Sequence, residues 1–255
     1  MDYNALLSLV TEIGFRLQQS GAEIYRVEES VQRVLQAYGV TNGEVFAIPN
    51  CLIVSVTETD GNAHTRVRRM PEHGTDIFRL EAVNDLCRRL CREVPPLTEA
   101  SGALEKVCAE SVRYPLPYVI AAYVAGSAAF CLFFGGTARD ALCSGICGGA
   151  MGLCLSAMEK LHTNQFFKTI AGGFLTALVA LALCTAGAGE SLSLIIIGAI
   201  MALTPGVAFT NAMRDMIAGD VVSGITKTVE TLLIAMAIAV GTGLALGLAK
   251  MLGGG

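Results

Sequence analysis

The second half of this 255-residue sequence contains very little charge. Residues 1–113 carry 12 Lys or Arg and 16 Asp or Glu side chains, whereas residues 114–255 carry only 6 of each. Hydrophobic residues make up 53% of the chain and the mean hydropathy is +0.56. These values exclude an ordinary water-soluble fold for the second half.

Several chemical signatures are also missing. The net charge is only -4, so the chain lacks the basic excess of a nucleic-acid-binding protein. There is no GxSxG, HExxH or P-loop motif, which argues against the common hydrolase and nucleotidase classes. The nine cysteines show no CxxC or other zinc spacing. We therefore expect no enzyme activity, no metal and no cofactor.

The few charges of the second half separate five charge-free runs. A helix needs roughly 20 apolar residues to cross a bilayer core of about 30 Å, so each run is long enough for one crossing. The expected transmembrane helices are 117–134, 141–158, 167–187, 191–209 and 226–249. The predicted fold class is a membrane protein, with an N-terminal cytoplasmic α+β domain (residues 1–113) followed by a five-helix transmembrane domain (residues 114–255).

Positive charges predict the orientation of these helices. If the N-terminal domain is cytoplasmic, the inner helix ends hold six Lys or Arg residues and the outer ends hold two. This excess satisfies the positive-inside rule. Five crossings then place the C-terminus outside. Pairs of glycines four residues apart also predict close helix packing at 145/149, 148/152 and 243/247.

Two kinds of apolar pattern predict a small α+β fold for the first half. Apolar residues at helical spacing indicate helices, and short β-rich stretches indicate strands. Asp60-Gly61-Asn62 has the composition of a hairpin turn. The expected order is two helices, three strands and two helices. The stretches are 4–19, 24–38, 44–47, 51–57, 63–70, 77–91 and about 98–112.

The soluble half contains a dense group of polar side chains around residues 20–29. The candidate residues of this domain are Glu23, Tyr25, Arg26, Glu28, Asn50, Arg66 and Arg68. One interpretation is a solvated face with helical ion pairs. The other is a functional site, either of a membrane-anchored enzyme or of a metabolite sensor.

The tripeptide Thr204-Pro205-Gly206 interrupts the fourth apolar run. Proline removes a backbone donor and clashes with the preceding turn, so we expect a broken or kinked helix. In lipid, the freed backbone groups must be satisfied by protein or by water in a cavity, and such breaks occur at transporter substrate sites. A simple proline kink beside a solvated loop is the alternative.

Polar residues near this break and near the other helix ends are further candidates, because carboxylates at membrane depth are costly. The complete set for a substrate or ion path is Thr204, Pro205, Gly206, Thr210, Asn211, Arg214, Asp215, Asp220, Glu230, Arg139 and Asp140.

Five ordered motifs give the chain a family resemblance. They are residues 20–29 (SGAEIYRVEE), 45–50 (VFAIPN), 53–56 (IVSV), 65–69 (TRVRR) and 204–215 (TPGVAFTNAMRD). With them, nearly the whole chain resembles the N-terminal half of the threonine/serine exporter (ThrE) family. It is similar to the large subunit of the split exporters, the YjjP type.

The resemblance implies a subunit of a secondary exporter in the plasma (inner) membrane of a bacterium. The implied cargo is threonine and serine, or succinate-like dicarboxylates, and export is expected to be proton-coupled. A separate small membrane subunit of the YjjB type would supply the second half, and homo-oligomers are a further expectation. Asn211 and a cation, Arg214 or Arg139, would contact the substrate, while Asp215, Asp220 or Glu230 would carry protons. A regulatory subunit remains the alternative.

Overall fold

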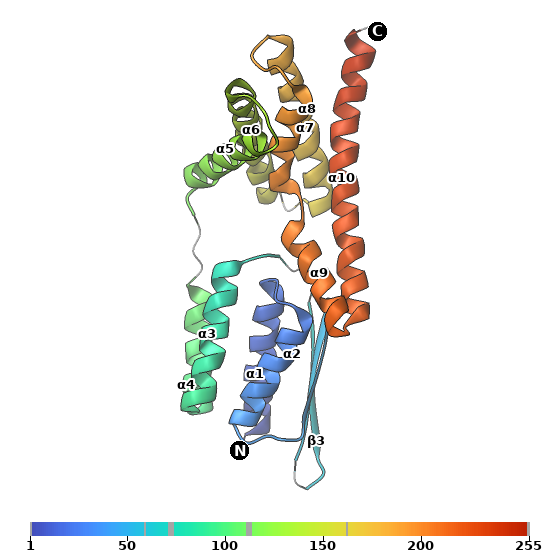
Figure 1. Ribbon diagram of the computed structural model, residues 1–255. Coiled ribbons are helices and arrows are strands. Elements are labelled where there is room, and N and C mark those ends of the chain that lie inside the picture. The colour runs from blue at the N-terminus through green and yellow to red at the C-terminus, as the bar shows by residue number, and fades with distance from the viewer. Residues whose placement is uncertain (1, 59, 71–73, 111–113, 162, 254–255) are drawn as a thin grey trace. The chain divides into compact units, whose positions relative to one another are not determined.

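The computed structural model describes residues 2–58, 60–70, 74–110, 114–161 and 163–253 (Figure 1). Contacts divide the chain into two compact units. The first comprises Met1–Val112 and Gly206–Val229, and the second comprises Arg113–Pro205 and Glu230–Gly255. The division falls between residues 112 and 113, and it groups residues 206–229 with the N-terminal residues.

The first unit contains the expected order of two helices, three strands and two helices, which confirms that part of the prediction. Its elements are α1 (Tyr3–Gln19), α2 (Ile24–Ala37), β1 (Gly43–Ile48), β2 (Cys51–Thr57), β3 (Ala63–Arg69), α3 (Ile77–Glu93) and α4 (Leu97–Ala109). To these the unit adds α9 (Gly206–Ala218) and the beginning of α10 (Val221–Gly253).

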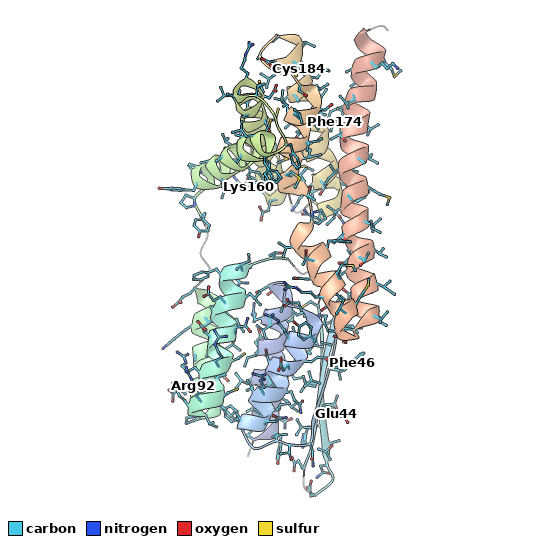
Figure 2. All side chains as sticks on the ribbon, viewed as in Figure 1. Glu44, Phe46, Arg92, Lys160, Phe174 and Cys184 are labelled. Carbon is cyan, nitrogen blue, oxygen red and sulfur yellow. The ribbon has the colours of Figure 1, made fainter. Side chains whose placement is uncertain are left out.

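The three strands form an antiparallel sheet in the order β1-β2-β3. Val54 of β2 pairs with Val45 of β1 and with Arg66 of β3. On β2, Leu52, Val54 and Val56 are fully buried, so the predicted alternation is correct. Helices α1 and α2 cover this buried face, whereas Figure 2 shows the labelled side chains Glu44 and Phe46 on the other side of β1.

The core of the first unit follows from helical spacing. On α1, apolar side chains three or four residues apart are fully buried, as they are on α2. Gly14 lies where α1 meets the sheet, and a Cβ there would come within 2.5 Å of the Leu52 side chain. The absence of a side chain at Gly14 therefore lets the Leu52 side chain of β2 pack closely against α1.

The second unit consists of long apolar helices. Its elements are α5 (Leu116–Phe133), α6 (Ala138–Lys160), α7 (Gln165–Thr185), α8 (Leu192–Ile200), the 3-10 turn η1 (Met201–Leu203) and the remainder of α10. Among the described residues, four helices (α5, α6, α7 and α10) are long and apolar enough to cross a membrane. The count reaches five only if α8-η1 and α9 together form one span.

The fourth expected span is therefore not one continuous helix. It breaks at Thr204 and Pro205, and the segments on either side, Leu192–Leu203 and Gly206–Ala218, are bent by 58°. The prediction of a break at the proline is confirmed. The neighbouring boundaries were placed wrongly, since α9 continues past 209 and α10 begins before 226.

Only some of the glycine pairs have a packing role. On α6, a Cβ on Gly148 would lie 2.6 Å from the Tyr123 carbonyl oxygen of α5, and Gly145, Gly149 and Gly152 also face α5. The prediction of close packing is thus confirmed for α6. On α10, no described atom lies within 4 Å of a Cβ built on Gly243 or Gly247, so the prediction is not confirmed there.

Candidate functional site at the start of α2

A tight turn of residues 20–23 joins α1 to α2 in the first unit. Gly21 has φ +92°, a conformation that side chains other than glycine rarely adopt, and a Cβ there would meet the Gly74 carbonyl oxygen at 2.7 Å. The Ser20 carbonyl accepts the Asp76 N–H at 3.1 Å. The turn is therefore held on one side by the segment that leads into α3.

Helix α9 binds the same turn through two polar side chains. Asn211 and Arg214 are three residues apart and so lie on one face of the helix. The Asn211 amide donates to the Gly21 carbonyl at 3.0 Å, and Arg214 Nη1 lies 2.9 Å from Glu23 Oε1. Two motifs about 190 residues apart in the sequence therefore meet here.

Asp215 is the centre of the site. Its side chain is fully buried, and Oδ1 accepts the Ile24 N–H at 2.9 Å, while Oδ2 lies 2.7 Å from Lys227 Nζ on α10. Lys227 is 14% exposed, and its ammonium group also lies 3.5 Å from the Ala22 carbonyl.

Asp215 supplies the missing N-cap of α2. The cap residue itself, Glu23, makes no side-chain capping hydrogen bond. A carboxylate at a helix start satisfies an otherwise unpaired N–H and interacts favourably with the helix dipole. The start of α2 thus depends on a residue from α9.

Glu23 is held as an anion although it is buried. Burial by itself would raise its pKa, but the hydrogen bonds from its own backbone N–H and from Arg214, with the charges of Arg26 and Arg214, outweigh burial and lower the pKa. Arg26 Nε lies 3.4 Å from Glu23 Oε2. Glu23 therefore forms ion pairs with one arginine of α2 and one arginine of α9.

The remaining candidates near the helix break have local partners. Thr204 and Thr210 donate to the carbonyls of Ile200 and Gly206, four residues earlier, at 3.3 and 2.9 Å. The backbone N–H of Asp220 donates to the Asp215 carbonyl at 2.9 Å. Glu230 belongs to the second unit.

Arg139 and Asp140 form a separate cluster in the second unit. Asp140 closes a capping box with Thr137 at the start of α6, and it accepts the N–H groups of Glu190 and Ser191 at 2.7 and 3.0 Å. Arg139 donates to the Gly187 carbonyl at 3.1 Å and lies 3.6 Å from Glu190. Together they fix the connection between α7 and α8.

The other candidates among residues 1–113 are dispersed over the first unit. Glu28 accepts the Ala47 N–H at 2.7 Å, and burial raises its pKa. Asn50 is exposed at the β1-β2 turn, and Arg66 is exposed on β3. Arg68 pairs with Glu12 on α1. Tyr25 accepts a hydrogen bond from Arg26 at 3.1 Å.

Sequence reasoning missed Lys227 as a member of the site. The signal that could have found it is charge complementarity, because Lys227 lies 12 residues after Asp215 in a region with few other charges. As for metals, no group of three His, Cys, Asp or Glu residues within the described part of the chain is placed to hold an ion.

The family model described as "Putative threonine/serine exporter" matches residues 8–249. The chain is 25% identical over 241 residues to the "Probable threonine/serine exporter" of Mycobacterium tuberculosis, covering 92% of this chain and 45% of that protein. It is also 25% identical over 221 residues to "Pheromone-regulated membrane protein 10" of Debaryomyces hansenii, covering 82% of this chain and 21% of the relative. The chain thus spans less than half the length of these curated relatives. No solved structure matches it.

Proposed function

Since the chain belongs to the threonine/serine exporter family, we propose that it is one subunit of a secondary exporter for small hydrophilic metabolites bearing a carboxylate. The cargo class is threonine and serine, or a succinate-like dicarboxylate, and export is driven by the proton gradient. A separate small membrane subunit of the YjjB type supplies the remaining helices.

The observation that carries this proposal is the attachment of α9 to the α1-α2 turn. The break at Thr204 and Pro205 leaves backbone groups that cannot face lipid and are suited to line a substrate path. Helix α9 begins directly after the break, and its Asn211 and Arg214 bind the turn. Movement of the turn would therefore move the helix that borders the path.

Asp215 is the proton carrier that the geometry favours. It is buried, and its carboxylate is shared between the Lys227 ammonium and the Ile24 N–H. Protonation would remove its negative charge and weaken both interactions. Proton binding would then release the start of α2 from α9, which couples protonation to a structural change.

The proposed location is the inner membrane of a bacterium, with the N-terminal domain (residues 1–113) in the cytoplasm and the C-terminus outside. The segment Leu192–Leu203 has 12 residues, or about 18 Å of helix, which is shorter than the bilayer core. An outside C-terminus requires α9 to complete this crossing. A reporter fused to the C-terminus tests this point: a cytoplasmic signal would show that the bent pair re-enters on the same side.

Transport in proteoliposomes tests the function. Labelled serine, threonine and succinate are offered under an imposed pH gradient to this chain alone and with the small subunit. Gradient-dependent flux that needs both subunits and disappears in Asn211→Ala is the expected result. Glu190→Gln, which changes an exposed residue of the second unit, serves as the matched control. No flux with both proteins folded would contradict the proposal and favour a regulatory subunit.

A further inference from the structure

A cleft of about 960 Å³ lies between α2 and α3 of the first unit. It is open to solvent, and its lining combines polar and apolar surface. The residues relevant here are Tyr25, Arg26, Arg33, Asn84, Arg88 and Arg92.

The cleft concentrates positive charge. Four arginines line it, two from each helix, whereas Glu29 is the acidic residue among its lining residues. Arg26 and Arg33 are seven residues apart on α2, and Arg88 and Arg92 are four apart on α3, so each pair shares one helix face. The two cationic faces meet at the cleft.

The existing acidic partners of these arginines hold them weakly. Arg33 lies 2.5 Å from Glu29, and Arg88 pairs with Asp85, but all four of these side chains are more than half exposed. Exposed ion pairs of this kind contribute little to stability. Within the described ranges, no acidic side chain pairs with Arg92, which is labelled in Figure 2. The guanidinium groups of Arg33, Arg88 and Arg92 are therefore available to a ligand.

We propose that this cleft binds a small soluble anion that carries two or more negative charges, of the phosphate or polycarboxylate class. Guanidinium groups bind phosphate and carboxylate oxygens in pairs of parallel hydrogen bonds. The Tyr25 hydroxyl and the Asn84 amide add neutral hydrogen-bonding groups. The volume falls within the range of small-molecule sites and exceeds the need of a single inorganic phosphate.

The site has a direct connection to the candidate functional site. Arg26 lines the cleft and also lies 3.4 Å from Glu23, which in turn binds Arg214 of α9. An anion in the cleft competes with Glu23 for Arg26. Binding therefore changes how the turn before α2 is held and gives the first unit a means of regulating α9. The proposed anion site itself does not depend on the transport assignment.

Calorimetric titration of the full chain in an uncharged detergent tests the proposal without a transport assay. The probes are pyrophosphate, citrate and inorganic phosphate, with zwitterionic serine and a short-chain phosphatidylglycerol as comparisons. We expect saturable binding of pyrophosphate or citrate, weakened about tenfold by Arg92→Gln through loss of one charge-assisted contact. Arg89→Gln is the matched control, because Arg89 is exposed on the same helix and does not line the cleft.

Three results would overturn the proposal. The first is equal weakening by the two arginine variants, which would indicate unspecific attraction to the protein's charge. The second is binding of the phosphatidylglycerol alone, which would assign the arginines to a lipid headgroup. The third is no binding of any multivalent anion to a protein whose thermal unfolding shows it to be folded.

Discussion

Two buried aspartates, Asp215 in the first unit and Asp140 in the second, hold helix starts in different ways. Asp140 is bound by Thr137 and by the backbone N–H groups of Glu190 and Ser191. Asp215 shares its carboxylate between a backbone N–H and the Lys227 ammonium. Backbone donors cannot change their charge, so the Asp140 arrangement is suited to a permanent support. A carboxylate paired with a cation between two segments is suited to a switch.

The largest expected effect is that of Asp215→Asn. The substitution leaves the nearly buried Lys227 ammonium without its carboxylate, and breaking a buried pair in this way costs about 3–5 kcal/mol. We expect loss of gradient-driven flux and a lower unfolding temperature, with the protein still present in the membrane. Flux and thermal unfolding are measured on the same purified preparation.

A double substitution separates stability from transport in this variant. Asp215→Leu with Lys227→Met removes both charges, and apolar replacement of a buried ion pair often restores stability. We expect recovery of the unfolding temperature without recovery of flux. Recovery of both would show that the pair only supports the fold, which would make the two aspartates equivalent.

Asp140→Asn is expected to affect stability alone. Asparagine loses the charge that binds two N–H groups of the α7-α8 connection, at a cost of about 1–3 kcal/mol. Flux per folded molecule should remain near that of the unchanged protein. A folded Asp140→Asn variant that no longer transports would place this residue on the substrate path and remove the distinction from Asp215.

The pH dependence of the unfolding temperature distinguishes Glu23 from an ordinary surface carboxylate. Its folded pKa lies below the ordinary value of 4.5, so its stabilising effect is present above that pH and is lost as the pH falls through the folded pKa. Unfolding temperatures measured from pH 6 down to about pH 3 should fall less steeply in Glu23→Gln than in the unchanged protein.

Glu28→Gln is the matched control for this experiment. Burial raises the pKa of Glu28, so the folded state favours its neutral form, and an amide oxygen can still accept the Ala47 N–H. Glutamine here should cause no loss of stability at neutral pH. If the two glutamate variants behave alike, the shared position of Glu23 between Arg26 and Arg214 has no special effect.

Local patterns were enough to predict most elements of the chain, because each depends on nearby residues. The alternation of Leu52, Val54 and Val56 identified a strand with one buried face, and Pro205 identified the break in the fourth apolar run. The capping box of Thr137 with Asp140 was not predicted, although it depends on residues only three apart. The hydrogen bond from the Glu190 N–H to Asp140 joins residues 50 apart.

The attachment of α9 to the α1-α2 turn could not be predicted in the same way. Asn211 and Arg214 are equally compatible with a solvated helix face, and nothing local indicates that Gly21 and Glu23 are their partners. Such pairing is decided by tertiary packing across about 190 residues. Apolar runs likewise reveal composition, but they do not show that residues 206–229 contact the N-terminal residues.

Arg139→Gln is expected to have the smallest effect. It tests whether Arg214 or Arg139 is the cation that contacts the substrate carboxylate. Arg139 and Glu190 are 3.6 Å apart and both more than half exposed, and such pairs contribute about 0–1 kcal/mol. The unfolding temperature should therefore change by less than about 4 °C. Flux of the carboxylate-bearing substrates should be unchanged, whereas Arg214→Gln, which frees Glu23 from α9, should reduce it. The reverse result, with flux lost in Arg139→Gln and kept in Arg214→Gln, would move substrate recognition to the second unit. The interactions of Arg214 with the turn would then be structural, and Asp140 rather than Asp215 would be the aspartate next to the transported carboxylate.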